Sequence, residues 1–156
     1  MAIIDLFIDI HAPQEDVYRI SQDYAVRFEW DPFPDRLEML DGASYEPARG
    51  NRVYVRSRLG MAMVVEFVQV DRPARAAVAM VSGPWFIGKF AGSWIFEERE
   101  KHLTRARFRY LVQARPALLR MLIDPVAALY FRQVVQKRLY GLKRYCERAT
   151  VAASVD

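Results

Sequence analysis

The side chains that most often carry chemistry in enzymes are sparse in this chain. His11 and His102 are its two histidines, and neither has a metal-binding partner at ligand spacing. Because a metal site needs several histidine, cysteine or carboxylate ligands together, we predict no metal. A Ser-His-Asp constellation would need one of these histidines as its base. His11 stands close to Pro13 at the end of a predicted strand, where a solvated loop histidine is the simpler interpretation. No catalytic residue can be assigned from these patterns.

Sequence motifs for nucleotide binding are also missing. The sequence has no Walker-type loop and no GxGxxG pattern, and its close glycines Gly88 and Gly92 fall inside a predicted strand. We therefore predict no cofactor. Cys146 falls in the apolar stripe of a predicted helix, which indicates a packing residue rather than a nucleophile. A single cysteine excludes an intrachain disulfide and fits a reducing compartment.

Large aromatic side chains are the most distinctive feature of the composition. The chain has nine Phe, eight Tyr and three Trp among 156 residues, more rings than a core of this size needs. Rings also line cavities that bind small molecules, so the excess favours a pocket. With 53% hydrophobic and 27% charged residues, the composition is otherwise that of an ordinary globular protein. We expect one domain over residues 1–149 and a frayed tail over residues 150–156.

Charge patterning constrains the partners only weakly. The net charge is +4, from 23 Lys and Arg against 19 Asp and Glu, and no run is rich in lysine or arginine. We predict no specific nucleic acid partner, while contact with a membrane or a ribosome stays open. The N-terminus carries acids where a signal peptide has basic residues, and no apolar run reaches membrane-spanning length. These observations favour a cytoplasmic protein of undetermined oligomeric state.

Alternating hydrophobicity predicts that most of the chain is an antiparallel sheet. Residues 2–10 alternate as a half-buried strand. Between residues 37 and 112, short alternating runs are separated by turn signals such as Asp41-Gly42, which implies a meander with one buried face. The last run carries three arginines on its outer face, and the first carries two aspartates on the corresponding face. We therefore expect the first strand to pair with the last. The charged residues concerned are Asp5, Asp9, Arg105, Arg107 and Arg109.

The segment between the first strand and the meander is rich in rings. Residues 13–22 are typical of a short helix. In residues 23–36, two prolines stand among four large rings and exclude a long regular element. We favour a second short helix or turn whose rings plug one end of the core. The alternative is a cavity rim with Trp30 over the opening.

A long amphipathic helix is predicted over residues 124–149. Asp124 suits the N-cap and Pro125 the first helical position, which separates this helix from a short lead-in helix over residues 116–122. Apolar residues then recur at helical spacing and form one face that needs a large apolar partner surface. These residues are Ala128, Phe131, Val135, Leu139, Leu142 and Cys146.

Four short motifs stand in this order of elements: the opening strand IIDLFIDIHAP, the helix QEDVYRISQDY, the aromatic segment FEWDPF and the helix ending LYGLKRYCE. Together with the order of the elements, they resemble the START-like superfamily, which includes polyketide cyclases, lipid-transfer domains and plant pathogenesis-related proteins. The resemblance covers nearly the whole chain. It implies an α+β helix-grip fold, in which a curved antiparallel sheet of six or seven strands wraps a long C-terminal helix, with two short helices after the first strand.

The same resemblance implies a cavity between the sheet and the last helix that takes a hydrophobic small molecule. Each inward ring or methionine is also a candidate for a simply filled core. The candidate cavity residues are Tyr24, Phe28, Trp30, Met63, Phe67, Met80, Phe90, Trp94, Phe108, Tyr110, Met121, Leu122, Tyr130 and Phe131.

Four further polar residues are candidates for the cavity: Gln69, Gln133, Arg56 and Arg58. An inward Arg56 or Arg58 would anchor a carboxylate or phosphate. We prefer an outward position for both arginines, facing Glu66, because an unpaired buried charge is costly.

Three functions remain in competition. The leading interpretation is binding of a hydrophobic small molecule such as a lipid, an isoprenoid quinone or a polyketide. The second is a polyketide cyclase or dehydratase, which requires a polar pair in the cavity such as Tyr110 with Arg56. The third is a ribosome- or membrane-associated module like the quinone-chaperone branch of the superfamily. It rests on the basic residues of the last helix, Arg132, Lys137, Arg138, Lys143 and Arg144.

Overall fold

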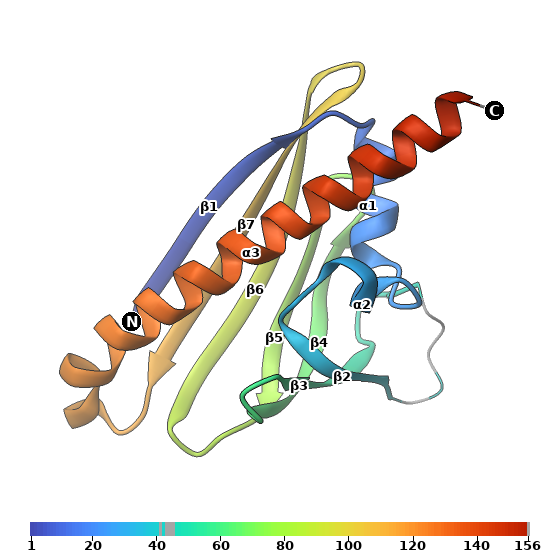
Figure 1. The fold of residues 1–156 in the computed structure, drawn as a ribbon. Helices are drawn as coiled ribbons and strands as arrows, with labels where there is room; N and C mark the ends of the chain where they lie inside the picture. Colours follow the sequence, from blue (N-terminus) through green and yellow to red (C-terminus); the bar gives the residue numbers. More distant parts are fainter. Residues whose placement is uncertain (41, 43–45, 156) are drawn as a thin grey trace.

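The computed structural model describes residues 1–40, 42 and 46–155, and in them a curved sheet wraps one long helix (Figure 1). The strands are all antiparallel, in the order β1-β7-β6-β5-β4-β3-β2, and two short helices follow the first strand. The predicted α+β helix-grip fold is confirmed, with seven strands in the sheet of the described residues. The elements are β1 (Ala2–Ile10), α1 (Gln14–Gln22), α2 (Arg27–Trp30), β2 (Pro34–Met39), β3 (Arg52–Ser57), β4 (Ala62–Asp71), β5 (Arg75–Ser82), β6 (Ile87–Glu100), β7 (Leu103–Ala114), the 3-10 turn η1 (Ala117–Leu119) and α3 (Arg120–Val155).

The first strand pairs with the last, as its charges predicted. In the β1–β7 register, Asp5 lies opposite Arg109 and Asp9 lies opposite Arg105. Arg107 Nε lies 2.6 Å from an Asp5 carboxylate oxygen, and Arg109 Nη2 lies 2.8 Å from the other. The hydrogen bond from Arg107 is the largest cause that lowers the pKa of Asp5 below its ordinary value. This outer face is a charged ladder that fixes register, while the opposite face is left for the core.

A bulge in β4 changes which of its side chains face the core. Met63, Val65 and Phe67 are buried on the inner face as the alternation predicts. The pairing with β5 then shifts between Phe67 and Gln69. Because a bulge inserts one unpaired residue, the alternation changes phase and Val70 packs against the core instead of Gln69. The prediction that Gln69 shares the inner face is therefore wrong.

The long helix has the predicted inner stripe but different ends. Phe131, Val135, Leu139, Leu142 and Cys146 are all buried. The helix begins at Arg120, so Pro125 lies inside it rather than at its first position, and it continues to Val155 rather than ending near residue 149.

Asp124, which the sequence predicted as an N-cap, lies within α3. One of its carboxylate oxygens is 2.6 Å from the N-terminal ammonium of Met1, and the other accepts a hydrogen bond from the Ala114 amide at 3.4 Å. It therefore ties the first residue of the described chain and the end of β7 to the helix.

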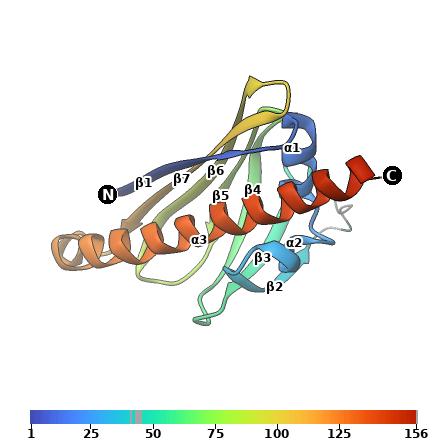
Figure 2. The same ribbon diagram turned by 45° about the horizontal axis from the view of Figure 1, so that its top comes forward.

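The short helices α1 and α2 lie beside the C-terminal half of α3 (Figures 1 and 2). α2 and α3 approach closely at Gly141, where an added Cβ would come within 2.1 Å of the backbone oxygen of Trp30. A glycine inside a helix costs about 1 kcal/mol relative to alanine, and here it lets α2 press directly on the helix backbone. The predicted turn at Asp41-Gly42 cannot be judged as a whole, since Asp41 lies outside the described residues.

Candidate functional site

An inner cavity of about 60 Å³ lies between the sheet, α2 and the middle of α3. That volume would hold roughly four water molecules, well below the roughly 300 Å³ at which small-molecule pockets begin. Most of the aromatic interior is therefore filled core. The cavity is lined by Gln22, Tyr24, Arg27, Asp31, Phe33, Pro34, Leu37, Val55, Met63, Val65, Phe67, Ala76, Val78, Phe90, Gly92, Trp94, Phe108, Tyr110 and Arg138.

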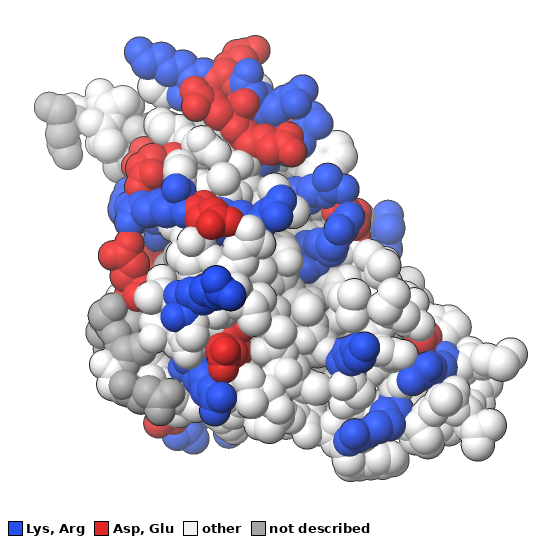
Figure 3. All heavy atoms as spheres, turned by 180° about the vertical axis from the view of Figure 1, so that it is seen from behind, with Lys and Arg blue, Asp and Glu red and all other residues white. Residues whose placement is uncertain are grey.

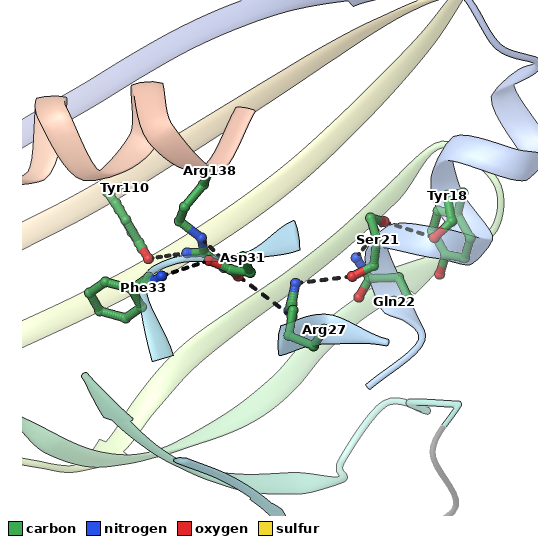
Figure 4. Close-up of polar contacts among 8 residues, drawn as sticks. All are labelled: Tyr18, Ser21, Gln22, Arg27, Asp31, Phe33, Tyr110 and Arg138. Atoms are coloured by element: carbon green, nitrogen blue, oxygen red, sulfur yellow. Dashed lines mark hydrogen bonds and ion pairs between the residues drawn. The ribbon is translucent and has the colours of Figure 1, made fainter. Parts of the chain in front are cut away.

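A buried ion pair between α3 and the end of α2 borders this cavity (Figure 4). Arg138 donates to the Asp31 carboxylate from Nε at 3.1 Å and from Nη2 at 2.8 Å. Its Nη1 donates a third hydrogen bond to the hydroxyl of Tyr110. Asp31 and Arg138 are only 1% and 6% exposed. A charge-assisted pair this deeply buried is stable only when most of its hydrogen-bonding groups are satisfied, as they are here.

A second arginine adds positive charge to the same site. The Nε of Arg27 lies 3.6 Å from the Asp31 carboxylate, and its Nη1 donates to the backbone oxygen of Ser21 at 3.0 Å. Two buried guanidinium groups thus share one carboxylate. Arg27 Nε and Trp30 Nε1 are also buried donors without a hydrogen-bond partner among the residues described. We call Arg27, Asp31, Tyr110 and Arg138 the buried polar cluster; its arginines exceed its carboxylate by one charge.

Aromatic rings hold the guanidinium groups in place. The Arg138 guanidinium carbon lies 4.7 Å from the ring centre of Phe108 and 5.3 Å from that of Phe33. Arg27 lies 4.8 Å from the ring centre of Tyr24. Stacking of this kind favours the planar guanidinium of arginine over the compact ammonium of lysine.

Burial and charge set the protonation states of the cluster. Burial raises the pKa of Tyr110 to about 12, against the opposing effect of the Arg138 charge, so its hydroxyl keeps its proton at neutral pH. Burial is the largest single effect on Arg138 and acts to lower its pKa, but the charge and hydrogen bonds of Asp31 together with the charge of Tyr110 raise it, and the pKa is raised overall. The Tyr110 oxygen accepts from Arg138, which leaves the Tyr110 proton free to be donated elsewhere.

Local sequence explains how Asp31 reaches this position. Asp31 is the C-cap of α2, and its backbone N–H bonds the Arg27 oxygen. Its side-chain Oδ1 accepts from the Phe33 amide at 3.0 Å across the intervening Pro32. The aspartate thereby closes a tight turn with one oxygen and presents the other to the arginines.

An outer groove lies next to the inner cavity, at the end of the molecule where α3 begins. Its volume is about 350 Å³, within the range of small-molecule pockets. The two spaces are neighbours along the same strands, because Met63 and Tyr110 line the cavity while Met61 and Val112 line the groove. The groove is lined by Leu59, Met61, Phe86, Ile87, Val112, Ala114, Leu122, Ile123, Asp124, Val126, Ala127, Tyr130 and Phe131.

Three rings stand between the two spaces. The Phe131 ring centre lies 5.4 Å from that of Tyr110 and 5.8 Å from that of Phe90. Phe131 lines the groove, while Tyr110 and Phe90 line the cavity. We call these three residues the ring partition.

Ten of the fourteen predicted apolar residues line one of the two spaces. Seven line the inner cavity: Tyr24, Met63, Phe67, Phe90, Trp94, Phe108 and Tyr110. Leu122, Tyr130 and Phe131 line the outer groove.

The other four predicted apolar residues lie elsewhere. Trp30 is buried against Trp94, with ring centres 5.9 Å apart, which agrees with a plug rather than a rim over the opening. Met80 packs on the core beside these spaces. Phe28 is 52% exposed and Met121 is 87% exposed, so the prediction that they face the cavity is wrong. Both sit on the outer sides of helices whose inner sides carry Trp30 and Phe131.

The predicted polar residues lie outside both spaces. Gln133 and Arg58 are exposed, and Gln69 bonds the Asp71 side chain near the surface. Arg56 points outward, as preferred, but its partner is Asp35 at 2.8 Å, while Glu66 is bonded by Arg52. The predicted partnership of the two arginines with Glu66 is wrong, and Arg56 cannot form the polar pair with Tyr110.

The partner of Tyr110 is instead Arg138, which was predicted to be one of the surface basic residues of the last helix. That prediction is wrong, because Arg138 is buried. Its spacing carried the signal: it lies three residues after Val135 and seven after Phe131, on the buried stripe. Arg27 and Asp31 carried no comparable signal, because their burial depends on where α2 docks.

The described ranges contain no group of three His, Cys, Asp or Glu side chains that could hold a metal ion. In the same ranges, no helix combines the length and the apolar character that crossing a membrane requires.

Comparison with known proteins places this geometry in context. Residues 1–147 match the model of a family described as polyketide cyclase / dehydrase and lipid transport. Among curated proteins, none matches the chain significantly in sequence.

Two solved structures illustrate the likeness of the fold. The Zhui aromatase/cyclase from Streptomyces sp. R1128 matches with a TM-score of 0.80 and 16% identity, over 97% of this chain and 96% of that one. A START superfamily protein from Mycobacterium smegmatis matches with a TM-score of 0.79 and 9% identity, over 96% and 99% of the two chains. At these identities the likeness concerns the fold.

Proposed function

The chain belongs to the polyketide cyclase / dehydrase and lipid transport family, and from that premise we propose that it binds an elongated, mostly apolar small molecule between the sheet and α3. The ligand carries oxygen acceptors at one end, which meets the buried polar cluster, while its apolar body extends toward the outer groove. The observation that carries this proposal is an apolar cavity that ends at two arginines sharing a single carboxylate.

The charge of the cluster favours an acceptor at the ligand's head. Arg27 and Arg138 bring two positive charges to a site where Asp31 supplies one negative charge. Burying an uncompensated charge is costly, so a carboxylate, an enolate or a polarised ketone in the cavity would be stabilised. Arg27 Nε is a buried donor that such an oxygen would satisfy.

The sizes of the two spaces favour an elongated body. The inner cavity alone is too small for a lipid, a quinone or a polyketide, whereas the neighbouring groove offers about 350 Å³. Rotation of Phe131 away from Tyr110 and Phe90 would join the two. We therefore expect the ring partition to move when the ligand enters.

Binding of cis-parinaric acid, a fluorescent fatty acid, tests this assignment. We expect the acid to bind the wild-type protein more tightly than its uncharged methyl ester. Replacing Arg27 by Met should weaken binding of the acid about tenfold, which corresponds to about 1.4 kcal/mol, and leave binding of the ester unchanged. Arg148→Met, on the exposed C-terminal part of α3, is the matched control. Equal affinity of acid and ester would contradict a charged head site, and binding of neither would contradict the pocket.

Catalysis of a cyclisation or dehydration is the second candidate, and one observation favours it. The Tyr110 hydroxyl holds its proton, receives a hydrogen bond from Arg138 and borders the apolar cavity. Such a hydroxyl can protonate or polarise a carbonyl of a chain held in a folded conformation. With a synthetic poly-β-ketone thioester, Tyr110→Phe should retain binding and lose the rate of ring closure. A wild-type rate equal to the uncatalysed rate would contradict catalysis, and ligand binding would then be the only function of the two that stands.

A further inference from the structure

An exposed apolar stripe runs along the start of α3. Its side chains recur at three- and four-residue spacing from η1 into the first turns of the helix. Their exposed fractions run from 63% to 89%, unusually high for large apolar residues placed together. We call them the apolar ridge: Leu118, Met121, Leu122, Val126 and Leu129.

Two loops extend this apolar surface around the mouth of the outer groove. Leu59, between β3 and β4, is 69% exposed, and Trp85, between β5 and β6, is 71% exposed. Leu59 lines the groove together with Leu122 and Val126 of the ridge. Trp85 stacks edge-on against Phe86, which also lines the groove. The ridge and both loops therefore belong to one end of the molecule.

Basic side chains accompany this apolar surface almost without acids. Asp124 is the one acidic residue between Glu100 and Glu147, and it is paired with the N-terminal ammonium. Arg115 and Arg120 donate from Nε to backbone oxygens, of Trp85 at 3.3 Å and Ala114 at 3.1 Å, which does not neutralise their charges. Further exposed basic residues on the elements at this end are Arg58, Lys89 and Arg132.

Figure 3 shows this end from behind, at the lower right. Separate Lys and Arg side chains, with little acidic surface among them, are set in a broad uncharged surface, whereas acids and bases alternate over the opposite end. The charge asymmetry therefore coincides with the apolar ridge.

We propose that this end docks on an anionic lipid membrane. The apolar ridge, Leu59 and Trp85 would enter the boundary between headgroups and acyl chains, and the surrounding arginines and lysines would meet the lipid phosphates. The outer groove would then open onto the bilayer. This inference stands apart from the proposed ligand, because ridge residues such as Leu118 and Met121 line neither the cavity nor the groove.

Charge decides between a membrane and a second copy of this chain. In a symmetric dimer the same patch meets itself, so the basic rim of one copy would face the basic rim of the other. Like charges brought together across an interface oppose association. An anionic bilayer instead offers complementary charge to the basic rim and an apolar layer for the ridge.

Trp85 supplies a direct readout of docking. The chain has three tryptophans, and Trp30 and Trp94 are only 5% and 4% exposed. A blue shift of tryptophan emission on adding vesicles therefore reports on Trp85. We expect the shift, and co-sedimentation, with vesicles of phosphatidylcholine and phosphatidylglycerol at low salt. The emission shift and the co-sedimentation should both decrease when salt is added, and both should be weaker with vesicles of phosphatidylcholine alone.

Paired variants separate the contribution of the apolar ridge to vesicle binding from that of the basic side chains. Leu118→Gln with Met121→Gln, two highly exposed positions, should lower vesicle affinity at least tenfold at an unchanged melting temperature. Arg115→Gln with Arg132→Gln should lower affinity for anionic vesicles and flatten the salt dependence. Val151→Gln and Arg148→Gln, on the far end of α3, are the matched apolar and basic controls.

Three outcomes would overturn the proposal. The first is a wild-type protein that does not bind anionic vesicles. The second is a ridge variant that binds as well as the Val151→Gln control. The third is a dimer in light scattering that the ridge variant abolishes while vesicle binding is absent, which would identify a second copy as the occupant. Retained cis-parinaric acid binding in the ridge variant would show that the ligand proposal survives independently.

Discussion

Arg138 is the side chain on which the interior depends most directly. It joins α3 to Asp31 at the end of α2 and to Tyr110 on β7, while four rings pack around its guanidinium. A buried pair of this kind adds little net stability when compared with apolar residues of the same shape, yet breaking it by removing one partner is costly. Arg138 therefore specifies where α2 docks as much as it stabilises the fold.

Replacing Arg138 by Met should destabilise the protein by about 3–5 kcal/mol, because Asp31 would be left buried with only the more distant Arg27 as an ionic partner. Urea unfolding measures this loss. The double variant Arg138→Met with Asp31→Asn should recover part of it, since the stranded charge is then removed. A single-variant loss below about 1 kcal/mol would contradict the burial of the pair.

Tyr110 predicts a specific alkaline dependence of stability. Its pKa is raised by burial to about 12 in the folded protein, against about 10 in an unfolded chain. Below about pH 10 the hydroxyl is protonated in both states; between about pH 10 and 12 only the unfolded state loses the proton, so folding becomes less favourable. The loss is on the order of 2–3 kcal/mol at 1.36 kcal/mol per pKa unit.

Comparing wild type with Tyr110→Phe across this range isolates the contribution of Tyr110, because other tyrosines and lysines titrate in both proteins. Between pH 9 and pH 12 the free energy of unfolding should fall further in the wild type than in the variant. The difference between the two proteins should be on the order of 2–3 kcal/mol. Parallel curves would mean that the hydroxyl is accessible to solvent.

Among the elements, the strands were the most predictable part of the fold. Met63, Phe67 and Phe108 were expected to face inward and are buried, and the charges of β1 and β7 identified the pairing of these two strands. The β4 bulge was not predictable from alternation, since the extra residue shows only in the pairing with β5. Gln69 was misplaced for that reason.

The start of α3 was missed because proline is usually read as a helix beginning. Pro125 is the sixth residue of the helix, so the missing N–H leaves the Met121 oxygen without its bond. Met121 is 87% exposed, which allows water to satisfy that oxygen. The local cost of the proline is thereby reduced at a solvent-facing position.

At Gly141 the backbones of α2 and α3 come close together, and Gly141→Ala should disturb both helices. The new Cβ would meet the Trp30 oxygen at 2.1 Å, so α2 must move and carry Asp31 with it. We expect a loss of about 1–3 kcal/mol from overpacking, despite the better helix propensity of alanine. Thermal unfolding and cis-parinaric acid titration should both report the change.

Gly88→Ala is the matched control for Gly141→Ala, because its Cβ would meet nothing closer than Arg115 Cβ at 3.4 Å. Equal melting temperatures of the two variants would mean that α2 yields freely, and α2 would then not hold Asp31 in a fixed position.

At the scale of the whole molecule, the sheet and α3 enclose two spaces that the ring partition keeps apart. The sequence predicted the fold and many of the lining rings because inward alternation and helical spacing are local patterns. It did not predict how far those rings fill the interior, which depends on the packing of side chains from distant elements. The charged half of the candidate site was missed for the same reason, since Arg27, Asp31 and Arg138 meet only in the folded chain.

Phe131→Ala tests whether the two spaces can become one. Removing the ring should cost about 3–5 kcal/mol and open the cavity to the groove. Binding of cis-parinaric acid should become faster, and the ligand should raise the melting temperature more than it does in wild type. Val135→Ala, which removes a fully buried residue that lines neither space, is the control. Identical ligand kinetics in both variants would contradict a gating role for Phe131.

The buried thiol of Cys146 makes the protein its own reporter of opening. The side chain is fully buried, and burial raises the pKa of the thiol to about 12. A thiol-specific reagent such as 5,5′-dithiobis(2-nitrobenzoate) therefore reacts only after an opening of the structure exposes this side chain of α3, and its rate reports how often such openings occur. Because the chain has one cysteine, the wild-type protein reports these openings around Cys146 without an engineered label. Bound ligand should slow the reaction of the thiol, and a membrane that loosens α3 should accelerate it.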